Sequence, residues 1–468
     1  MYETSLILSA ILFGLICLFY INTGLASIFH PVTYYLAFHG IVFVLRPFFQ
    51  YYGDYQSIYE VYKFVPTDAV KLTTLLIANI GLICFVASAL YVGRRPMRFA
   101  PEATLAYQAT ERRGGKQLLL TLAICSPLIA LSFHYALQAT PYEDSPLASM
   151  IRDQTTNYTI FTSNTGYILA ADTMMLSLSV LIAWAFRFRL ISLIPLAGFV
   201  AIETYIGFGR WAFVMTLASF GLLYLYDKRR RWVTLRFVVL AALVLVVFSA
   251  LGTSRTAIHD WVTGQQTEGA EGAFDDPDRK GYFDQMDFAN LEFLEYIVSI
   301  VPDKTRTYDY FLKNLELFTA PVPRILWPGK PIGPPIQLYN INDYGYPIGI
   351  TWTLVGEGWQ DCGYLGVIIW CCFGGALWGL LYRWFVNSKQ TRTQIAVYCV
   401  LLPISIQWFR DGILITLVKF PFFPLLAILI WHAICQIGPL GRKLITGQVA
   451  LHRRASHAGR PARPLIEG

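Results

Sequence analysis

The sequence predicts an all-α polytopic membrane protein with about eleven transmembrane helices. Of its 468 residues, 55% are hydrophobic and only 14% are charged, and the mean hydropathy is +0.47. Soluble domains carry about 25% charged residues. Eleven apolar stretches approach the ~20 residues that a helix needs to cross a bilayer. This composition excludes a soluble globular enzyme.

The apolar stretches alternate with short polar segments over most of the chain. They lie at about residues 5–21, 31–49, 68–92, 117–137, 164–186, 190–209, 211–226, 233–251, 363–382, 395–409 and 413–437. One polar segment is far longer than the others. We therefore expect four parts: an N-terminal bundle of about eight spans (1–251), a large loop with short helices (252–362), about three C-terminal spans (363–437) and a basic tail (438–468).

Neither the cysteines nor the N-terminus suggests a secreted, disulfide-bonded protein. Seven of the eight cysteines lie inside apolar spans and Cys362 lies at the edge of one, without a disulfide framework or a CxxC pattern. The Met-Tyr-Glu-Thr-Ser start lacks the basic region of a cleaved signal peptide. The first apolar stretch is therefore expected to be a retained span.

Basic residues are concentrated in alternate loops and in the C-terminal tail. These segments hold 22 of the 37 basic residues and four of the 30 acidic residues, so the net charge of +7 divides into +18 on one side and −11 on the other. By the positive-inside rule the +18 side is cytoplasmic. This places the C-terminus inside and, with eleven spans, the N-terminus outside. The tail is expected near anionic lipid, and no nucleic-acid partner is expected.

The same orientation places residues 252–362 outside the membrane as one 111-residue segment. Loops longer than about 15 residues are usually functional or disordered. Within this loop, residues 304–318 are predicted to form an amphipathic helix on the outer membrane surface, because apolar residues recur there at helical spacing. These residues are Tyr308, Phe311, Leu312, Leu315 and Phe318.

Several cations stand at the outer ends of separate spans, against the overall charge gradient. They are Arg46, Arg210, Arg255, Arg410 and Lys419, and two more, Arg324 and Lys330, lie in the long loop. One interpretation is that each long side chain reaches the head groups of the outer leaflet. The other is that separate helices turn these cations toward one phosphate or pyrophosphate, to which arginine offers paired donors.

Acidic residues occur at similar depth, namely Glu203, Asp172, Glu357, Asp361 and Asp411. Glu203 is two helical turns before Arg210 on one face, so an ion pair or a shared polar pocket is expected at least as much as a catalytic role. Asp172 lies near the middle of its span, must face protein or water, and is compatible with a proton-coupled transporter. No HExxH or GxSxG motif occurs on the external side, and no metal or other cofactor is expected.

Two motifs late in the chain resemble those of a known family. The first holds Pro323, Arg324, Trp327, Pro328, Lys330 and Pro331, and the second holds Gly356, Glu357, Gly363 and Gly366. With these residues the chain resembles the bacterial O-antigen or oligosaccharide repeat-unit polymerases, which also make capsular polysaccharide and exopolysaccharide. The turn at Gly209 and Arg210, and Arg410 after the next-to-last span, are also similar to that family. Many members have Asn-Phe where this chain has Asp361-Cys362, which leaves the role of Asp361 open.

The resemblance implies a GT-C-like, polyprenyl-dependent glycosyltransferase in the bacterial inner membrane, with a periplasmic N-terminus and a cytoplasmic C-terminus. Such an enzyme moves the growing glycan from its undecaprenyl pyrophosphate carrier onto a newly flipped repeat unit at the periplasmic face. The implied partners are polyprenyl-pyrophosphate-linked oligosaccharide and membrane lipids, with a chain-length regulator and a flippase as further candidates. A leaving pyrophosphate needs charge neutralisation, which suitably aimed cations supply.

Roles for individual residues follow from this implied reaction. The expected catalytic residues are Arg210, Arg410, Arg255, Glu357 and Glu203, and the expected substrate-binding residues are Arg324, Lys330, Trp327, Arg46, Asp361 and Asp411. The three catalytic arginines are assigned the pyrophosphate. Arg324 and Lys330 are assigned a second phosphate or the glycan, and Trp327 a sugar ring. Glu357 is the first candidate for the base that takes the acceptor proton, and Glu203 is the second.

Other functions stay open from the sequence. An O-antigen ligase has similar topology but passes the glycan to the lipid A core. A polyprenyl-monophosphate sugar transferase usually carries an acidic pair in a large first external loop. Here the corresponding loop, residues 50–67, is short and holds only Asp54 and Glu60 as acidic residues. A lipid-linked oligosaccharide flippase or transporter is disfavoured by the 111-residue external segment. A structural scaffold in a polysaccharide export complex is the last alternative.

Overall fold

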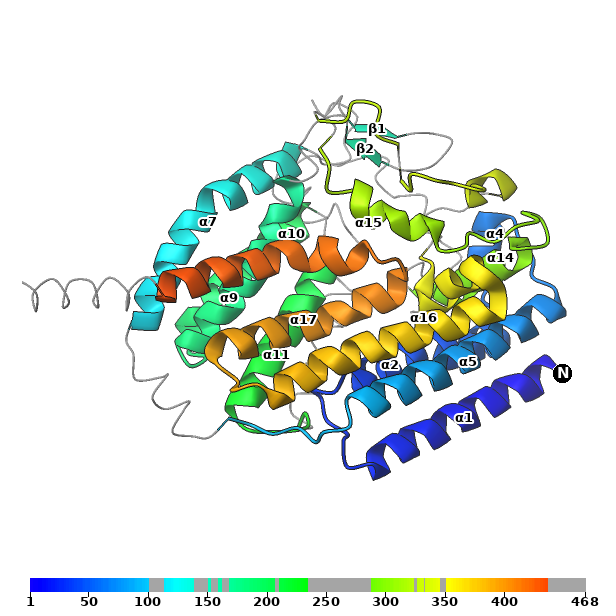
Figure 1. Cartoon of the computed structure of the whole chain (residues 1–468), viewed down its shortest axis with the longest axis horizontal. Helices are drawn as coiled ribbons and strands as arrows, with labels where there is room; N and C mark the ends of the chain where they lie inside the picture. Colours follow the sequence, from blue (N-terminus) through cyan, green and yellow to red (C-terminus); the bar gives the residue numbers. More distant parts are fainter. Residues whose placement is uncertain are drawn as a thin grey trace, which may run out of the picture.

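A computed structural model of the chain describes residues 1–100, 113–138, 150–152, 159–161, 168–206, 210–234, 288–323, 326–331, 333–345 and 351–436. Within these residues the protein is helical, apart from two short strands that pair antiparallel, β1 (Met150–Arg152) and β2 (Thr159–Phe161). Figure 1 shows long helices lying side by side in a bundle. The predicted α-helical character is confirmed for the described part of the chain.

Six helices among the described residues are long and apolar enough to cross a membrane. They are Tyr2–Asn22, Pro31–Gly53, Asp68–Val92, Gln117–Tyr135, Thr353–Asn387 and Thr416–Gln436. Shorter apolar helices accompany them at Ala170–Ala185, Leu190–Ile202 and Val214–Asp227. All of these coincide with predicted spans and support a membrane-embedded protein. The predicted span 233–251 falls almost entirely outside the described residues.

The bundle is built from three parts of the chain. The first part forms α1 (Tyr2–Asn22), α2 (Pro31–His39), the π-helical η1 (Gly40–Leu45), α3 (Arg46–Gly53), α4 (Ser57–Tyr62) and α5 (Asp68–Val92). The middle part forms α7 (Arg113–Gln138), η2 (Ala170–Thr173), α9 (Met174–Ala185), η3 (Leu190–Leu193), α10 (Ile194–Ile206) and α11 (Arg210–Asp227). The last part forms α14 (Asn290–Ile300), η5 (Leu312–Leu315), α15 (Glu316–Thr319), η6 (Ile341–Tyr344), α16 (Thr353–Asn387) and α17 (Arg392–Asp411), followed by the helix Thr416–Gln436.

Close packing joins α5 and α16, which come from opposite ends of the sequence. A methyl group on Gly375 would lie 2.3 Å from the Phe85 carbonyl oxygen, so only glycine fits there. Beside this contact, Tyr35 of α2 stacks on Phe85 with ring centroids 3.8 Å apart, and Phe409 of α17 meets both rings edge-on. Small residues and interlocking aromatics are a usual means of helix association in membranes. This core supports the ends of α16 and α17, where the candidate site lies.

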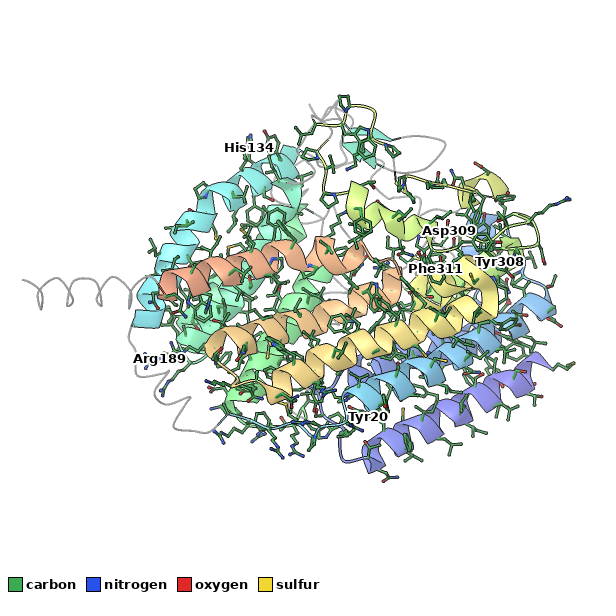
Figure 2. The ribbon with its side chains drawn as sticks, in the orientation of Figure 1. Tyr20, His134, Arg189, Tyr308, Asp309 and Phe311 are labelled. Atoms are coloured by element: carbon green, nitrogen blue, oxygen red, sulfur yellow. The ribbon has the colours of Figure 1, made fainter. Side chains whose placement is uncertain are left out.

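The basic loops meet at one end of the bundle, which we call the basic end. Arg95, after α5, donates a hydrogen bond to Asn387 at the end of α16 (2.6 Å). Arg231, after α11, donates to the Met97 carbonyl (3.1 Å). In Figure 2, Arg189 also lies toward this end. Loops that the sequence assigns to one side of the membrane are therefore together in space.

The opposite end of the bundle carries the N-terminus, and we call it the N-terminal end. Glu3 of α1 accepts a hydrogen bond from Tyr52 of α3 there (3.0 Å). Figure 1 shows α4, α14 and the beginning of α16 at this end, and Figure 2 places Asp309 among them. The described part of the acidic loop thus lies away from the basic end, in agreement with the charge pattern.

α16 consists of two helical segments joined at a sharp break. Cys362 (φ −157°, ψ 31°) and Gly363 (φ 60°, ψ −136°) depart from helical geometry. Residues eight apart in a straight α-helix are about 12 Å apart, yet a methyl group on Gly358 would lie 2.7 Å from the Gly366 carbonyl oxygen. Residues 353–361, which we call the short helix, therefore fold against the start of the longer segment. The predicted span 363–382 corresponds to the longer segment alone.

The amphipathic helix predicted for 304–318 is wrong over most of that range. Turns occupy residues 301–311, and only the 3-10 turn η5 and the short α15 follow them. Arg306, Tyr310 and Phe311 have positive φ values of 55°, 53° and 64°, which a continuous right-handed helix does not allow. The chain turns at these residues and runs back to the short helix.

α14 is a helix that the sequence analysis did not predict. Ten of its eleven residues are buried, including Glu292 and Glu295. It packs against α5, η1 and the short helix at the N-terminal end. The two glutamates lower its hydropathy, and their burial is explained only by partners far away in the sequence.

Candidate functional site

The short helix lies at the N-terminal end, where α14 and the end of α17 pack closely on it. A methyl group on Gly356 would lie 3.2 Å from Leu294 of α14. At the end of α17, a methyl group on Gly412 would lie 2.3 Å from the Thr353 carbonyl oxygen and 3.0 Å from Glu357 Cβ. The glycines in and beside the second motif therefore allow neighbouring elements to pack directly on the helix that carries its acidic residues.

The segment 309–311 caps the end of the short helix. The backbone amide of Asp309 donates to the Gln360 carbonyl (2.8 Å), and that of Tyr310 donates to the Asp361 carbonyl (3.1 Å). The Phe311 amide donates to Asp361 Oδ1 (3.0 Å). The last carbonyl groups of a helix need such donors. These bonds fix the segment to the helix, and Figure 2 shows Asp309 and Phe311 beside the beginning of α16.

Lys313 forms an ion pair with Glu357, the glutamate of the second motif. Its Nζ lies 3.0 Å from Glu357 Oε2, with 11% of the lysine side chain and 1% of the glutamate side chain exposed. The ammonium group also lies over the Trp352 ring, 3.7 Å from its centroid. A lysine has three N–H donors, so the ion pair leaves donors for a ligand.

Three carboxylates gather around this lysine, and we call Asp309, Lys313, Tyr339, Glu357 and Asp361 the acidic cluster. Asp309 Oδ2 accepts a hydrogen bond from the Lys313 amide (2.8 Å). Glu357 Oε1 and Asp361 Oδ2 are buried without a hydrogen-bond partner among the described residues. Buried polar atoms without partners are costly and point to a bound water or ligand. The cluster thus offers two oriented acceptor oxygens beside one donor.

Burial and mutual repulsion perturb the groups of the cluster that lie outside the spans. Burial raises the pKa of Asp309, while the amide and the charge of Lys313 oppose the rise. Burial also raises the pKa of the Tyr339 hydroxyl, and the carboxylates of Asp309, Glu357 and Asp361 raise it further. The acidic cluster therefore holds three carboxyl groups that affect one another and a single basic side chain, Lys313.

A second group of charges adjoins the cluster at α15. Glu316 lies within electrostatic range of Lys313, Lys330 and Lys419, which we call the lysine group. Burial raises the pKa of Glu316, and the three lysines oppose that rise. Lys313 lies in η5, Lys330 in the first motif and Lys419 in the last described helix, so three separate segments place a cation within electrostatic range of Glu316.

We call the described residues of the first motif, Pro323 and 326–331, the strap. Lys330 Nζ donates to the carbonyl groups of Ala320 (2.8 Å) and Val322 (2.9 Å), which ties the strap to the chain before it. Trp327, which belongs to the strap, is 38% exposed. The lysine thus has a structural part in holding the strap, and the tryptophan is accessible for contact with a ligand.

Arg410 and Asp411 end α17 beside the short helix. The Asp411 carboxylate accepts hydrogen bonds from Gln407 (3.0 and 3.1 Å) and from the Thr416 hydroxyl (3.2 Å). The next residue, Gly412, contacts the short helix as described above. The structure therefore brings the predicted residues Arg410, Asp411, Glu357 and Asp361 to one end of the bundle.

Arg46 lies in a separate buried arrangement. Its Nη2 is 2.5 Å from Glu292 Oε1, its Nε donates to the same oxygen (2.7 Å), and its guanidinium lies over the Tyr55 ring at 5.2 Å. Both side chains of the ion pair are 1% exposed. The positive charge of Arg46 is therefore balanced by Glu292 of α14, in an arrangement separate from the lysine group.

The other predicted residues lie wholly or partly outside the described residues. Arg255 and Arg324 belong to such segments, and only the backbone is described for Glu203 in α10 and Arg210 at the start of α11. Asp172 in η2 accepts a hydrogen bond from the Thr173 amide (2.7 Å). Its place at a helix start is typical of a short polar side chain.

Lys313, Asp309 and Glu316 are site residues that the sequence analysis did not select. All three fall within 304–318, where the spacing of the apolar residues predicted an amphipathic helix on the outer membrane surface. The signal that distinguishes them is the alternation of acidic and basic residues beside an aromatic pair, Tyr310 and Phe311. That pattern alone does not show that the chain turns back toward Glu357.

No family model, curated protein or solved structure matches this chain. Among the described residues, no group of three or more His, Cys, Asp or Glu side chains is arranged to hold a metal ion. The fold and the site define a helical membrane protein with carboxylates, cations and aromatic side chains at one end of its bundle. Its function is inferred from that chemistry.

Proposed function

We propose that the protein polymerises undecaprenyl-pyrophosphate-linked oligosaccharide repeat units into O-antigen, capsular polysaccharide or exopolysaccharide. The reaction takes place at the periplasmic face of the bacterial inner membrane. A hydroxyl group of the new repeat unit attacks the anomeric carbon of the growing chain. The bond from that carbon to the pyrophosphate breaks, and its electron pair leaves with the lipid carrier.

The observation that supports this proposal best is the meeting of the two motif segments at the N-terminal end. Lys313 pairs with Glu357 of the second motif, and Glu316 lies within electrostatic range of both Lys313 and Lys330 of the first motif. A transfer from lipid pyrophosphate needs cations for the leaving group and a carboxylate for the acceptor hydroxyl. Both kinds of group occur together here, at the end of the bundle opposite the basic loops.

The cations are assigned to the phosphates of the donor. Arg410 at the end of α17, with Arg210 and Arg255, is proposed to bind the pyrophosphate. Arg324 and Lys330 are proposed to bind a second phosphate or the glycan. A hydrogen-bond donor aimed at developing negative charge lowers the free energy of activation by about 3 kcal/mol, if values from other oxyanion sites are applied. Several such donors supply a large part of the required stabilisation.

Deletion of the gene in its own host tests this function against its rivals. A polymerase deletion leaves single repeat units attached to the surface lipid. Loss of a ligase leaves no attached units, and loss of a flippase leaves lipid-linked units on the cytoplasmic face of the membrane. Single attached units are the expected result, and normal polymer in the deletion strain would contradict the proposal.

A further inference from the structure

The acidic cluster has the wrong charge balance for a phosphate. Glu357 pairs directly with the ammonium group of Lys313, and Asp309 and Asp361 lie within electrostatic range of the same group. Like charges at this range repel each other strongly in a partly buried site. A sugar is neutral and carries many hydroxyl groups, which donate to carboxylates and accept from an ammonium group. The chemistry of the cluster therefore fits a sugar.

We infer that the acidic cluster binds the acceptor sugar of the proposed reaction, and that Asp361, rather than Glu357, takes the proton from the attacking hydroxyl. This inference rests on the proposed function. It leaves the cations outside the cluster, Arg410, Lys330 and Lys419, for the phosphates of the donor. The site is thereby divided into an acceptor half and a donor half, which meet at Lys313 and Glu316.

Asp361 is held in a position suited to proton transfer. Its Oδ1 is fixed by the Phe311 amide at 3.0 Å, whereas its Oδ2 is buried and has no partner among the described residues. The backbone around it is fixed as well, because the Tyr310 amide donates to the Asp361 carbonyl. One oxygen is thus an anchor and the other is an oriented acceptor, as a general base requires.

Glu357 has a different task, because its Oε2 is engaged by Lys313 at 3.0 Å. This ion pair and the Trp352 ring hold the ammonium group on two sides. Glu357 is therefore a positioning residue that acts through Lys313. Lys313 in turn donates to a hydroxyl group of the acceptor next to the one that reacts.

Exposure differs between the residues of the cluster and those beside it. Glu357 and Asp361 are fully buried, whereas Lys313, Tyr339 and Trp352 are partly exposed. A sugar that binds the cluster therefore meets these three side chains first. Aromatic side chains beside carboxylates give both a flat contact surface and hydrogen-bond acceptors.

In the transfer step, the O–H bond of the acceptor breaks as the new bond between its oxygen and the anomeric carbon forms. The proton moves to Asp361 Oδ2. The electron pair of the broken anomeric bond leaves with the pyrophosphate. Atoms and charge balance without an oxidant, a reductant or another co-reactant.

The first test measures equilibrium binding of a soluble glycoside of one repeat unit, without pyrophosphate, to the purified protein in lipid nanodiscs. We expect Lys313→Met to weaken binding at least tenfold, while the exposed control Asp343→Asn binds as the wild type does. An absence of binding to the wild type would overturn the acceptor assignment. Equal binding by Lys313→Met would overturn it as well.

The second test measures the rate of transfer to this glycoside from a lipid-linked donor as a function of pH. Asp361→Asn keeps the acceptor for the Phe311 amide but cannot take a proton. We therefore expect the transfer rate to fall about 10²- to 10⁴-fold and no longer to rise with pH. Asp361→Glu should restore part of the rate. Glu357→Gln should raise KM for the glycoside and keep the pH profile.

Two results would assign the roles differently. A wild-type rate for Asp361→Asn would overturn the assignment of Asp361 as the base. The same holds if Glu357→Gln loses the dependence of the rate on pH and Asp361→Asn keeps it. A wild-type protein that binds the glycoside through Lys313 but transfers nothing would refute the proposed function and the proton transfer. That same result would support the sugar-binding role of the cluster.

Discussion

Arg46 and Glu292 form a fully buried ion pair, with Nη2 and Oε1 2.5 Å apart. The pair joins the helical segment Pro31–Gly53 to α14, which follows much later in the chain. Beside it, Tyr59 of α4 donates a hydrogen bond to Glu295 and accepts one from Gln50. This network connects α14 to the first part of the bundle, and α14 in turn packs on the short helix. The candidate site is therefore supported by a buried polar network beneath it.

Breaking this ion pair should destabilise the protein strongly. Arg46→Met leaves Glu292 as an uncompensated buried charge, which costs about 3–5 kcal/mol. The double substitution Arg46→Met with Glu292→Leu should recover much of that loss, because no lone charge remains. Thermal unfolding in detergent checks this, with the exposed Lys304→Met as the control. Equal stability of Arg46→Met and Lys304→Met would show that the pair is not important for the fold.

Glu295 should make stability depend on pH. Burial raises its pKa from 4.5 to about 8, although the hydrogen bond from Tyr59 lowers it. A carboxyl group with a raised pKa in the folded state stabilises that state fully below pH 4.5, and this contribution is lost as the pH rises through about 8. The unfolding temperature should therefore fall as the pH rises from 4.5 to about 8. Over this range the free energy of unfolding should decrease by on the order of 3–5 kcal/mol.

Glu295→Gln should remove this pH dependence, because the amide does not ionise. It should be more stable than the wild type above pH 8, where the carboxylate of the wild type is charged and buried. The matched control is Glu60→Gln, at an exposed position of α4 near the same network. Parallel pH curves for the wild type and Glu295→Gln would contradict this interpretation.

Gly358 should not tolerate a side chain. A methyl group there meets backbone of the longer segment of α16, with the Gly366 carbonyl oxygen and Val367 Cα both 2.7 Å away. Gly358→Ala should move the short helix, lower the unfolding temperature and abolish polymer formation, at a cost of about 1–3 kcal/mol. The control is Gly221→Ala in α11, where nothing lies within 4 Å of the added atom and alanine favours the helix. Unchanged polymer with Gly358→Ala would mean that the two segments do not need this contact.

Arg410 should be needed for polymer formation and not for folding. It ends α17 beside Asp411 and the short helix, so Arg410→Ala removes a cation from the donor half of the site. We expect polymer to be absent while the amount of protein in the membrane stays normal. Arg383→Ala, an exposed arginine of α16 toward the basic end, is the control and should keep wild-type polymer. Polymer of wild-type length with Arg410→Ala would remove this residue from the catalytic set.

Hydropathy and charge predicted much of the fold because the bilayer restricts what a spanning helix can contain. The span predicted at 68–92 coincides with α5 (Asp68–Val92). The basic loops are together at one end of the bundle, as the positive-inside rule requires. These features depend on composition over many residues, so single exceptions do not disturb them.

The site could be predicted only in part, because its geometry depends on contacts between distant segments. The motif containing Glu357 was found, but its partner Lys313 was not, since the positive φ at Tyr310 and Phe311 ends the regular spacing. α14 was missed because Glu292 is polar in the sequence and is buried only with Arg46. Three-dimensional pairing of this kind leaves no local pattern.

The account depends most directly on whether the purified protein alone joins lipid-linked repeat units. The decisive measurement supplies one synthetic undecaprenyl-pyrophosphate-linked repeat unit, without added metal or nucleotide sugar, and separates the products by size. The account predicts a ladder of oligomers that the wild type makes and that Asp361→Asn and Arg410→Ala do not. A ladder that required nucleotide sugar, or no ladder from folded wild-type protein, would contradict it.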